Sequence, residues 1–245
     1  MRLSIIIPVY NEEKHIAQVI ESVISANSLG MNKEIIVVDD GSTDNTASKV
    51  KGQISRLRQG FDGQAKLIFI EKMRNEGKGA ALKAGFRKAT GDILMVQDAD
   101  LEYSVKDYPK LLAPLLNDRT KVVYGSRNLK RENYKNRYSY FSFYLGGMLL
   151  TWIVNMLYGL RLTDHPTGYK LFSSSLLKYL LQPKERRFSY EVAITACLAK
   201  AHVPFIEVPI HYRPRTMKEG KKINALDFVK SVIVAIKYKY GNERI

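Results

Sequence analysis

Short apolar runs alternate with amphipathic segments along the first half of the chain. The runs are rich in β-branched residues and too evenly apolar for amphipathic helices, so they predict buried parallel strands. They are Ser4–Val9, Glu34–Val38, Lys66–Ile70, Asp92–Val96 and Lys121–Tyr124. The segments between them carry apolar residues three and four positions apart and predict helices. These are Glu12–Asn27, Asp44–Arg58, Gly77–Ala89 and Val105–Leu116, with Asp44 and Ser104 as N-caps. This alternation predicts a Rossmann-like α/β fold, with a mostly parallel sheet flanked by helices.

The pattern changes after Arg127, where the chain becomes polar and basic before an uncharged stretch, residues 138–160. We expect an irregular segment around residues 164–170 and a basic loop at residues 213–222. Regular elements are predicted near Tyr190–Ala201 (helix), over Phe205–Ile210 (strand) and over Asn224–Tyr240 (helix). The sequence therefore predicts one continuous domain with two functional halves, residues 1–127 and residues 128–245.

The formal net charge of this chain of 245 residues is +15, which favours anionic partners such as phosphorylated substrates, acidic lipids or nucleic acid. A basic module that binds nucleic acid or membranes without catalysis would explain the charge alone. Cys197 is the single cysteine, so no disulfide can form within the chain. The N-terminal residues do not have the pattern of a signal peptide.

Carboxylates follow three of the predicted strands. Asp39 and Asp40 follow the second strand, and Asp98 and Asp100 follow the fourth, while Glu12 lies just beyond the first. The carboxyl ends of parallel strands share one edge of the sheet, where ligands bind. Like charges gathered there repel unless a cation offsets them. Asp98 and Asp100 therefore predict a Mg²⁺ or Mn²⁺ site completed by substrate phosphates, which a non-catalytic module would not need.

A second candidate site lies at residues 75–81, where small residues surround Lys78 at a predicted helix start. Such a start is a natural seat for a phosphate, because its backbone N–H groups point outward. The spacing is not that of a P-loop.

Taken together, the motifs resemble glycosyltransferase family two, and more narrowly the dolichyl-phosphate mannose and glucose synthases. The resemblance covers almost the whole chain and keeps the family's order. Its motifs are IIPVYNEE (6–13), VVDDGSTD (37–44), NEGKGAALKAGF (75–86), DADLE (98–102), YGSR (124–127), TDHPTGYKLF (163–172), FSYE (188–191), EVPIHYRPR (207–215) and EGKKI (219–223).

The resemblance implies a GT-A fold with a nucleotide-binding half and a C-terminal acceptor-binding extension that carries interfacial helices. The implied nucleotide-binding residues are Pro8, Tyr10, Glu12, Asp39, Lys78, Asp98, Arg215 and Lys221. The implied metal ligands are Asp98, Asp100 and Glu102, where mannose synthases usually have Gln in place of Glu102. The implied acceptor residues are Arg127, Arg137 and Asp164, and the implied catalytic residues are Asp100, Arg127 and Arg213.

The activity expected from this resemblance is inverting transfer of a hexose, mannose or glucose, from a GDP- or UDP-hexose to a polyprenyl or dolichyl phosphate. A lipid phosphate is already an anion at neutral pH and needs no general base, which fits the lack of histidine beside the acidic strand ends. The alternative within the family is a saccharide hydroxyl as acceptor. That reaction needs a carboxylate base, for which Asp164 and Glu191 are the candidates.

Residues 138–160 are long enough to cross a bilayer, but serine, glycine, threonine and asparagine dilute them. We favour helices that lie in the membrane interface, with a core helix pair as the alternative. Many members of the family have a C-terminal transmembrane tail, and none is expected in this chain. The expected location is peripheral, at the cytoplasmic face of a membrane, with direct attachment or a membrane-anchoring partner subunit. No nucleic-acid partner is expected.

Overall fold

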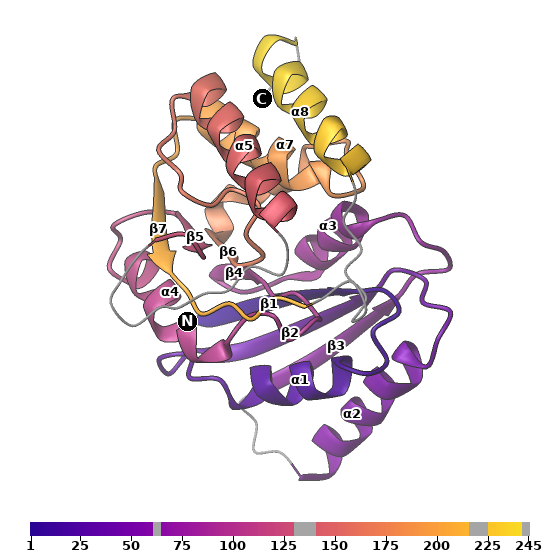
Figure 1. Cartoon of the computed structure of the whole chain (residues 1–245). Helices are drawn as coiled ribbons and strands as arrows, with labels where there is room; N and C mark the ends of the chain where they lie inside the picture. The colour runs from indigo at the N-terminus through magenta and orange to yellow at the C-terminus, as the bar shows by residue number, and fades with distance from the viewer. Residues whose placement is uncertain (61–64, 130–140, 216–224, 242–245) are drawn as a thin grey trace.

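The computed structural model describes residues 1–60, 65–129, 141–215 and 225–241, and the side chains of these except 57–60, 141–143 and 225. Its centre is a seven-stranded sheet in the order β3-β2-β1-β4-β6-β5-β7 (Figure 1). The strands are β1 Arg2–Val9, β2 Asn32–Asp39, β3 Ala65–Glu71, β4 Ile93–Val96, β5 Val122–Ser126, β6 Lys170–Ser173 and β7 Phe205–Pro209. All neighbours pair in parallel except β6, which is antiparallel to both β4 and β5. The predicted mostly parallel sheet is confirmed.

Strand β6 is the element that the sequence analysis missed, because its residues adjoin a segment expected to be irregular. It has four residues, the first of which is Lys170, so it offers neither a long apolar run nor an alternation. The strand exists because β4 and β5 supply hydrogen-bond partners on both sides. Both halves of the chain thus contribute strands to the same sheet, since β6 and β7 come from residues 128–245.

Helices cover both faces of the sheet. They are α1 Ile16–Ser25, α2 Thr46–Gly60, α3 Lys78–Lys88, α4 Tyr108–Leu116, α5 Phe141–Tyr158, α6 Leu177–Leu181, α7 Ser189–Lys200 and α8 Ala225–Tyr240, with 3-10 turns at Val105–Asp107 and Ser174–Leu176. Successive side chains of β1 point to opposite faces of the sheet, so they show which helices cover each face. Ile5 and Ile7 pack into the cluster that contains α1 and α4, and Ile6 packs with α3 and α7 on the other face.

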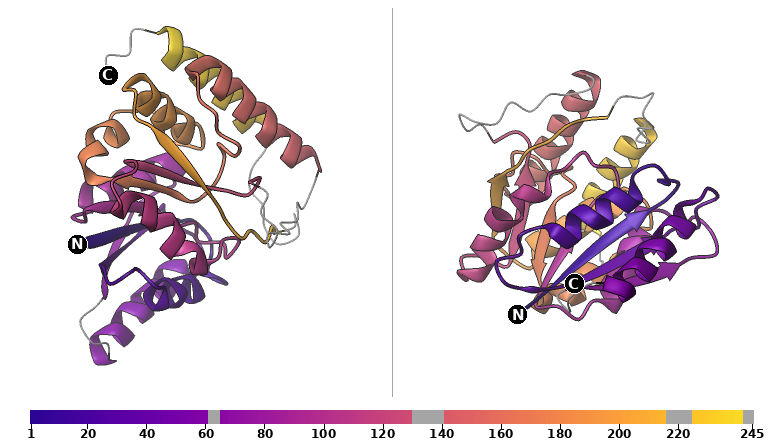
Figure 2. Two further views of the ribbon diagram at one scale, coloured as in Figure 1. Left: turned by 90° about the vertical axis from the view of Figure 1, so that its left-hand side faces the viewer. Right: turned by 90° about the horizontal axis from the view of Figure 1, so that it is seen from below.

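Helices α5 and α8 form a third layer. They pack on each other and on α7, at the end of the molecule opposite α1 and α2 (Figures 1 and 2). In the described part of the uncharged stretch, residues 141–160, there is one helix, α5. The predicted final helix is confirmed as α8. Among the helices of the described residues, none is both long and apolar enough to cross a membrane.

The predicted helix start at Glu12 is wrong, because α1 begins at Ile16. The backbone N–H of Glu12 donates to Thr46 Oγ1 at 2.9 Å, and the Glu12 carboxylate contacts Arg215, so this turn belongs to the site. The predicted caps behave as expected. Ser104 accepts from Lys106 N, and Asp44 Oδ1 accepts from Thr46 N at the start of α2.

Candidate active site

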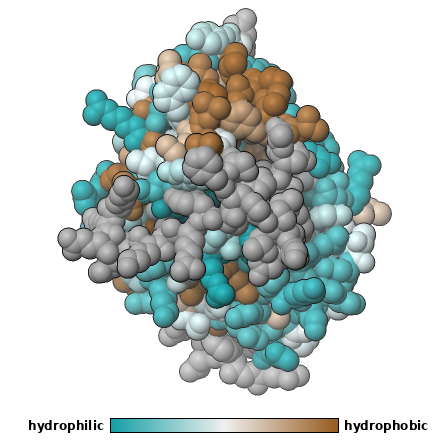
Figure 3. Space-filling view, in the orientation of Figure 1, coloured by the Kyte–Doolittle hydropathy of each residue, from teal (hydrophilic) through white to brown (hydrophobic). Residues whose placement is uncertain are grey.

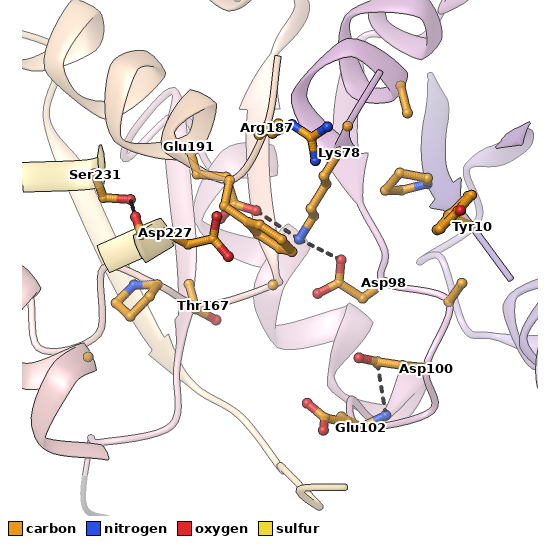
Figure 4. A pocket seen from close by; sticks show the side chains of 18 of the residues that line it. Tyr10, Lys78, Asp98, Asp100, Glu102, Thr167, Arg187, Glu191, Asp227 and Ser231 are labelled. Carbon is orange, nitrogen blue, oxygen red and sulfur yellow. Dashed lines mark hydrogen bonds and ion pairs between the residues drawn. The ribbon is translucent and has the colours of Figure 1, made fainter. Parts of the chain in front are cut away.

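A cavity of about 1050 Å³ lies beyond the carboxyl ends of β1, β2 and β4 (Figure 4). Strand ends and the first turn of α3 form one wall, and α5, α7 and α8 contribute the other. The strand arrangement explains the place, because parallel β1, β2 and β4 end at the same edge of the sheet. The lining includes Pro8, Tyr10, Glu12, Asp40, Lys78, Asp98, Asp100, Glu102, Arg127, His165, Thr167, Arg187, Glu191, Arg215, Asp227 and Ser231.

Lys78 connects the two walls of the cavity. Its Nζ lies 2.8 Å from Asp98 Oδ1 and 2.7 Å from Glu191 Oε1, as the dashed lines in Figure 4 mark. The other oxygen of Glu191 lies 2.6 Å from the Nζ of Lys170, on β6. Burial alone would raise the pKa of Glu191, but the attraction of Lys170 and Lys78 lowers it to about 2. Glu191 is therefore a fixed carboxylate at neutral pH.

The glycines around Lys78 serve the close packing of α7 against α3. Gly77 has a φ of 103°, and a Cβ there would lie 2.7 Å from the carbonyl oxygen of Arg186. A Cβ at Gly79 would collide with Tyr190. The N–H of Ala80 donates to the Arg186 carbonyl at 2.8 Å, so this helix-start N–H is used within the protein rather than presented to a phosphate.

Arg215 faces the acidic strand ends. Its Nη1 lies 3.1 Å from Glu12 Oε2 and its Nη2 lies 3.3 Å from Asp100 Oδ2. Burial, followed by repulsion from Asp98 and Glu102, raises the pKa of Asp100 to about 7. The repulsion among these carboxylates has to be offset by positive charge, and in this structure Arg215 and Lys78 supply it.

Asp98 and Asp100 fit a divalent ion by their chemistry. Both are hard oxygen donors that line the cavity, and Mg²⁺ is usually held by one or two carboxylates plus substrate phosphates. Within the part of the chain that the structure describes, no three His, Cys, Asp or Glu side chains gather as a metal-binding group. Glu102, the third metal ligand that the resemblance implies, accepts from Tyr212 Oη at 2.8 Å and from Arg215 N at 2.7 Å, which anchors the segment after β7.

Arg127, which follows β5, lies in the cavity wall and is held by Asp164. Its Nε and Nη2 each lie 2.7 Å from an oxygen of Asp164, and its own backbone N–H donates to the same carboxylate at 2.8 Å. The N–H of Asp164 donates to Glu207 Oε1 on β7 at 2.9 Å. The guanidinium lies 5.0 Å from the ring centre of Tyr212. Arg127 is thus fixed in direction by several elements.

Most of the predicted site residues lie together in this cavity. Those that line it are Pro8, Tyr10, Glu12, Lys78, Asp98, Asp100, Glu102, Arg127 and Arg215. Asp39 is buried and accepts from Ser42 instead, and Arg213 is exposed with its N–H on the Glu102 carbonyl. Asp164 touches the site through Arg127. Arg137 and Lys221 lie outside the described residues, and the functional roles of all these residues stay predictions.

The sequence analysis did not predict several of the residues that line the cavity. Arg187 precedes α7, and Asp227 and Ser231 belong to α8, whose spacing predicted only a helix. Asp227 and Ser231 are four residues apart, so they share one face of the helix that carries polar groups into the cavity. This pair is the signal that could have been noticed in residues 225–240.

Comparison with known proteins gives the family. Residues 4–180 match the family described as "Glycosyl transferase family 2". The UDP-N-acetylglucosamine–dolichyl-phosphate N-acetylglucosaminyltransferase of Methanococcus voltae is 31% identical over 89% of this chain and 89% of its own length. The dolichyl-phosphate beta-glucosyltransferase ALG5D of Trichomonas vaginalis is 27% identical over 94% of this chain and 71% of its own length.

Solved structures confirm the fold. Glucosyl-3-phosphoglycerate synthase of Mycobacterium tuberculosis aligns with a TM-score of 0.71 and 20% identity, over 97% of this chain and 80% of that one. The same synthase with Mn²⁺, UDP-glucose and glycerol 3-phosphate aligns with a TM-score of 0.66 and 20% identity, with the same coverage. The predicted GT-A architecture is therefore confirmed. The chain belongs to glycosyl transferase family 2, and it is a glycosyltransferase.

Proposed function

We propose that the chain transfers a sugar from a nucleotide diphosphate to a polyprenyl or dolichyl phosphate, with inversion at the anomeric carbon. One observation carries the choice of acceptor: the two carboxylates that the sequence analysis named as candidate bases for a hydroxyl acceptor are both held in ion pairs. Asp164 accepts two hydrogen bonds from the Arg127 guanidinium, and Glu191 lies between Lys78 and Lys170.

A carboxylate that is stabilised by cations is a weak base, because taking up a proton would cost it those interactions. The lowered pKa of Glu191 expresses the same cost. A lipid phosphate is an anion before the reaction starts and needs no proton removed. The named relatives, which by their names act on dolichyl phosphate, support this acceptor class.

Each side of the cavity then has a role. Pro8, Tyr10 and Glu12, at the end of β1, contact the nucleoside. Arg215 exchanges part of its contact with Glu12 and Asp100 for the donor diphosphate and stabilises the charge that develops on the leaving group. Arg127, directed by Asp164, holds the acceptor phosphate in line for displacement.

Asp98 and Asp100 hold the Mg²⁺ or Mn²⁺ ion in this proposal. When bound, the ion would supply positive charge to the diphosphate leaving group. Lys78, now paired with Asp98, is close enough to share that task. The structural neighbour whose description includes Mn²⁺ and UDP-glucose supports the chemistry.

The same comparisons support a choice of donor. One relative is named for N-acetylglucosamine transfer and the other for glucose transfer, and UDP is the nucleotide in the first name. We therefore propose a UDP-sugar donor. This widens the sequence expectation of mannose or glucose to include N-acetylglucosamine.

The layer of α5 and α8 provides attachment to a membrane surface. Its outward side is apolar, as the brown area at the top of Figure 3 illustrates. The exposed apolar side chains are Leu145, Met148, Leu149, Trp152 and Met156 on α5, and Leu226, Val229, Ile233, Ile236 and Tyr240 on α8. Other residues of the same helices, such as Leu150 and Phe228, line the cavity. A lipid phosphate could then reach Arg127 without leaving the bilayer surface.

The direct test is transfer by the purified chain from UDP-N-acetylglucosamine, UDP-glucose and GDP-mannose, with Mn²⁺, to three acceptors. We expect product with a short dolichyl phosphate and none with the matching prenol or with an oligosaccharide, and NMR of the product should report an inverted anomeric centre. Glycosylation of a hydroxyl with none of the phosphate would contradict the proposal and would place a base among Asp164, Glu191 and Asp227.

A further inference from the structure

The segment between α5 and β6 presents two buried polar atoms without a partner. Among the described residues, the buried side-chain atoms that lack a hydrogen bond are His165 Nδ1, Thr167 Oγ1 and Arg215 Nε. The last lies 3.9 Å from Glu102 and belongs to the ionic group around Asp100. His165 and Thr167 are separate from that group, and both line the cavity.

Such atoms need an explanation, because an unsatisfied buried polar atom costs about 1–3 kcal/mol. His165 is 1% exposed and Thr167 is not exposed at all. Thr167 is labelled in Figure 4 in the wall of the cavity. Because both residues line the cavity, a molecule bound there can supply the missing partners.

The hydrogen bonds beneath His165 determine its tautomer. The Thr195 hydroxyl donates its single proton to the Glu191 carbonyl oxygen at 3.0 Å. Two further groups contact the same hydroxyl oxygen, Tyr124 Oη at 2.8 Å and His165 Nε2 at 3.1 Å. Because the proton of Thr195 is already used, both of these groups must donate to it. His165 Nε2 therefore carries the ring proton, and Nδ1 is left as a bare acceptor.

The ring stays in this state at neutral pH. Burial, followed by repulsion from Lys170, lowers the pKa of His165 to about 3, so the imidazole is neutral. A neutral acceptor needs a ligand that donates. Sugar hydroxyls and the amide N–H of an N-acetyl group are donors, whereas an ionised phosphate offers only acceptor oxygens.

Position agrees with this chemistry. Gly168, next to Thr167, lies so close to Asp98 that a Cβ there would collide with the Asp98 carboxylate. The 165–167 strip thus runs beside the carboxylate assigned to the donor diphosphate, where the sugar of the same donor would lie. We propose that His165 and Thr167 form the subsite that binds hydroxyl or amide groups of the transferred sugar and selects among sugars. This inference rests on the proposed function.

Matched substitutions separate the two nitrogen atoms of His165. His165→Gln can keep a donor toward Thr195 and has no acceptor at the Nδ1 position. His165→Asn can place its amide oxygen near the Nδ1 position and loses the bond to Thr195. At the second position, Thr167→Val removes the hydroxyl with little change in shape, and Thr167→Ser keeps it.

The measurement is calorimetric binding of UDP-N-acetylglucosamine and UDP-glucose, each compared with UDP, in the presence of Mn²⁺. We expect His165→Gln and Thr167→Val each to weaken binding of a UDP-sugar by about tenfold, the effect of one lost hydrogen bond, and to leave UDP binding unchanged. His165→Asn and Thr167→Ser should stay within about threefold of the wild-type chain. The UDP affinity also reports whether each variant is folded.

Other results overturn the subsite. Equal weakening of UDP and UDP-sugar would indicate a structural role, and no weakening at all would mean that only ordered water occupies the strip. A raised KM for dolichyl phosphate with unchanged UDP-sugar binding would assign the strip to the acceptor. Failure of the proposed function is distinguishable, since the chain would then bind UDP-sugars without transfer to dolichyl phosphate.

Discussion

Arg127 and Asp164 are locked together by two parallel hydrogen bonds of 2.7 Å, between side chains that are 17% and 2% exposed. The pair joins the end of β5 to the segment after α5, and Glu207 on β7 holds that segment in turn. This geometry fixes the direction of the guanidinium. It also makes Asp164 a poor general base, because its carboxylate is paired with Arg127. The pair therefore links the preference for a phosphate acceptor to the fold itself.

The first prediction concerns this pair. Arg127→Lys keeps the charge and loses the two-pronged bond, so we expect transfer to short dolichyl phosphate to fall by about 10–100-fold through a higher acceptor KM. Binding of UDP should change little. Arg127→Ala alone leaves Asp164 buried and unpaired and should cost about 3–5 kcal/mol of stability.

The double variant Arg127→Met/Asp164→Asn is the matched control, because it removes both charges. It should recover stability in urea unfolding without recovering transfer. Recovery of transfer along with stability would show that Arg127 only supports the fold.

The second prediction concerns the metal. EDTA should abolish transfer, and Mn²⁺ or Mg²⁺ should restore it. Asp98→Asn or Asp100→Asn should lower transfer by about 1000-fold, because each removes the negative charge of a carboxylate ligand. Glu102→Gln can keep its contacts to Tyr212 and Arg215, so its apparent Mn²⁺ affinity should stay within about threefold of wild type. Full activity in EDTA, or a Glu102→Gln chain that no longer responds to Mn²⁺, would contradict this assignment.

The sheet was predictable because strands that are buried on both faces appear in the sequence as short apolar runs. Strands β1 and β2 are each buried at seven of their eight positions and contain the apolar runs Ile5–Ile7 and Ile35–Val38. The acidic residues that follow these strands have to meet at one edge. The position of the carboxylates in the cavity follows from those two facts. The amino-acid sequence alone is therefore enough to assign Asp98, Asp100 and Glu12 to one site.

The pairing of the site residues was not predictable from local patterns. Arg215 contacts Glu12, which lies 203 positions earlier in the sequence. Lys170 contacts Glu191 from strand β6, which the local sequence pattern does not predict. Such contacts depend on the order of the strands and on the packing of α7 against the sheet. Neither can be predicted from the periodicity or motif spacing of a single sequence. The unpartnered atoms of His165 and Thr167 belong to the same category, since they emerge only from a full account of hydrogen bonds.

The third prediction concerns Gly168, where an added Cβ would collide with the Asp98 carboxylate. A Cβ there would also lie 2.7 Å from the Tyr103 ring, which is buried and unable to move freely. Gly168→Ala should therefore displace Asp98 and lower UDP binding in Mn²⁺ by about tenfold or more. Gly52→Ala on α2, which has open space, should leave binding unchanged and add up to about 1 kcal/mol of stability. Equal binding by both variants would contradict the predicted displacement.

The fourth prediction tests the apolar surface of α5 and α8. Trp152→Glu and Ile233→Glu each replace a side chain that is 58% exposed, so the fold should tolerate them. Co-sedimentation with vesicles that contain anionic lipid should weaken by about tenfold for each, because about 1.5–3 kcal/mol of apolar burial is lost. Leu29→Glu, exposed at the turn before β2, is the control. Unchanged sedimentation of the α5 and α8 variants would place membrane attachment elsewhere.

The last prediction concerns Glu191 and acid. Its pKa in the folded chain is about 2, whereas an unfolded glutamate titrates near about 4.3. A lowered pKa means that the carboxylate stabilises the fold above the unfolded value, and that this contribution disappears as pH falls toward 2. The difference corresponds to ~3 kcal/mol. In urea unfolding, the gap between wild type and Glu191→Gln should therefore be widest at pH 6 and should shrink steadily below about pH 4.5.

Comparison of two variants removes the effect of other carboxylates that titrate over the same range. Glu71→Gln provides the control, because Glu71 pairs with Lys51 at 2.8 Å while both side chains are about half exposed. An exposed pair of this kind contributes at most about 1 kcal/mol, and salt screens it. A gap for Glu191→Gln that stays constant from pH 6 to pH 2.5 would mean that Lys78 and Lys170 do not hold the carboxylate ionised. Glu191 would then be able to take up a proton and could serve a hydroxyl acceptor as base.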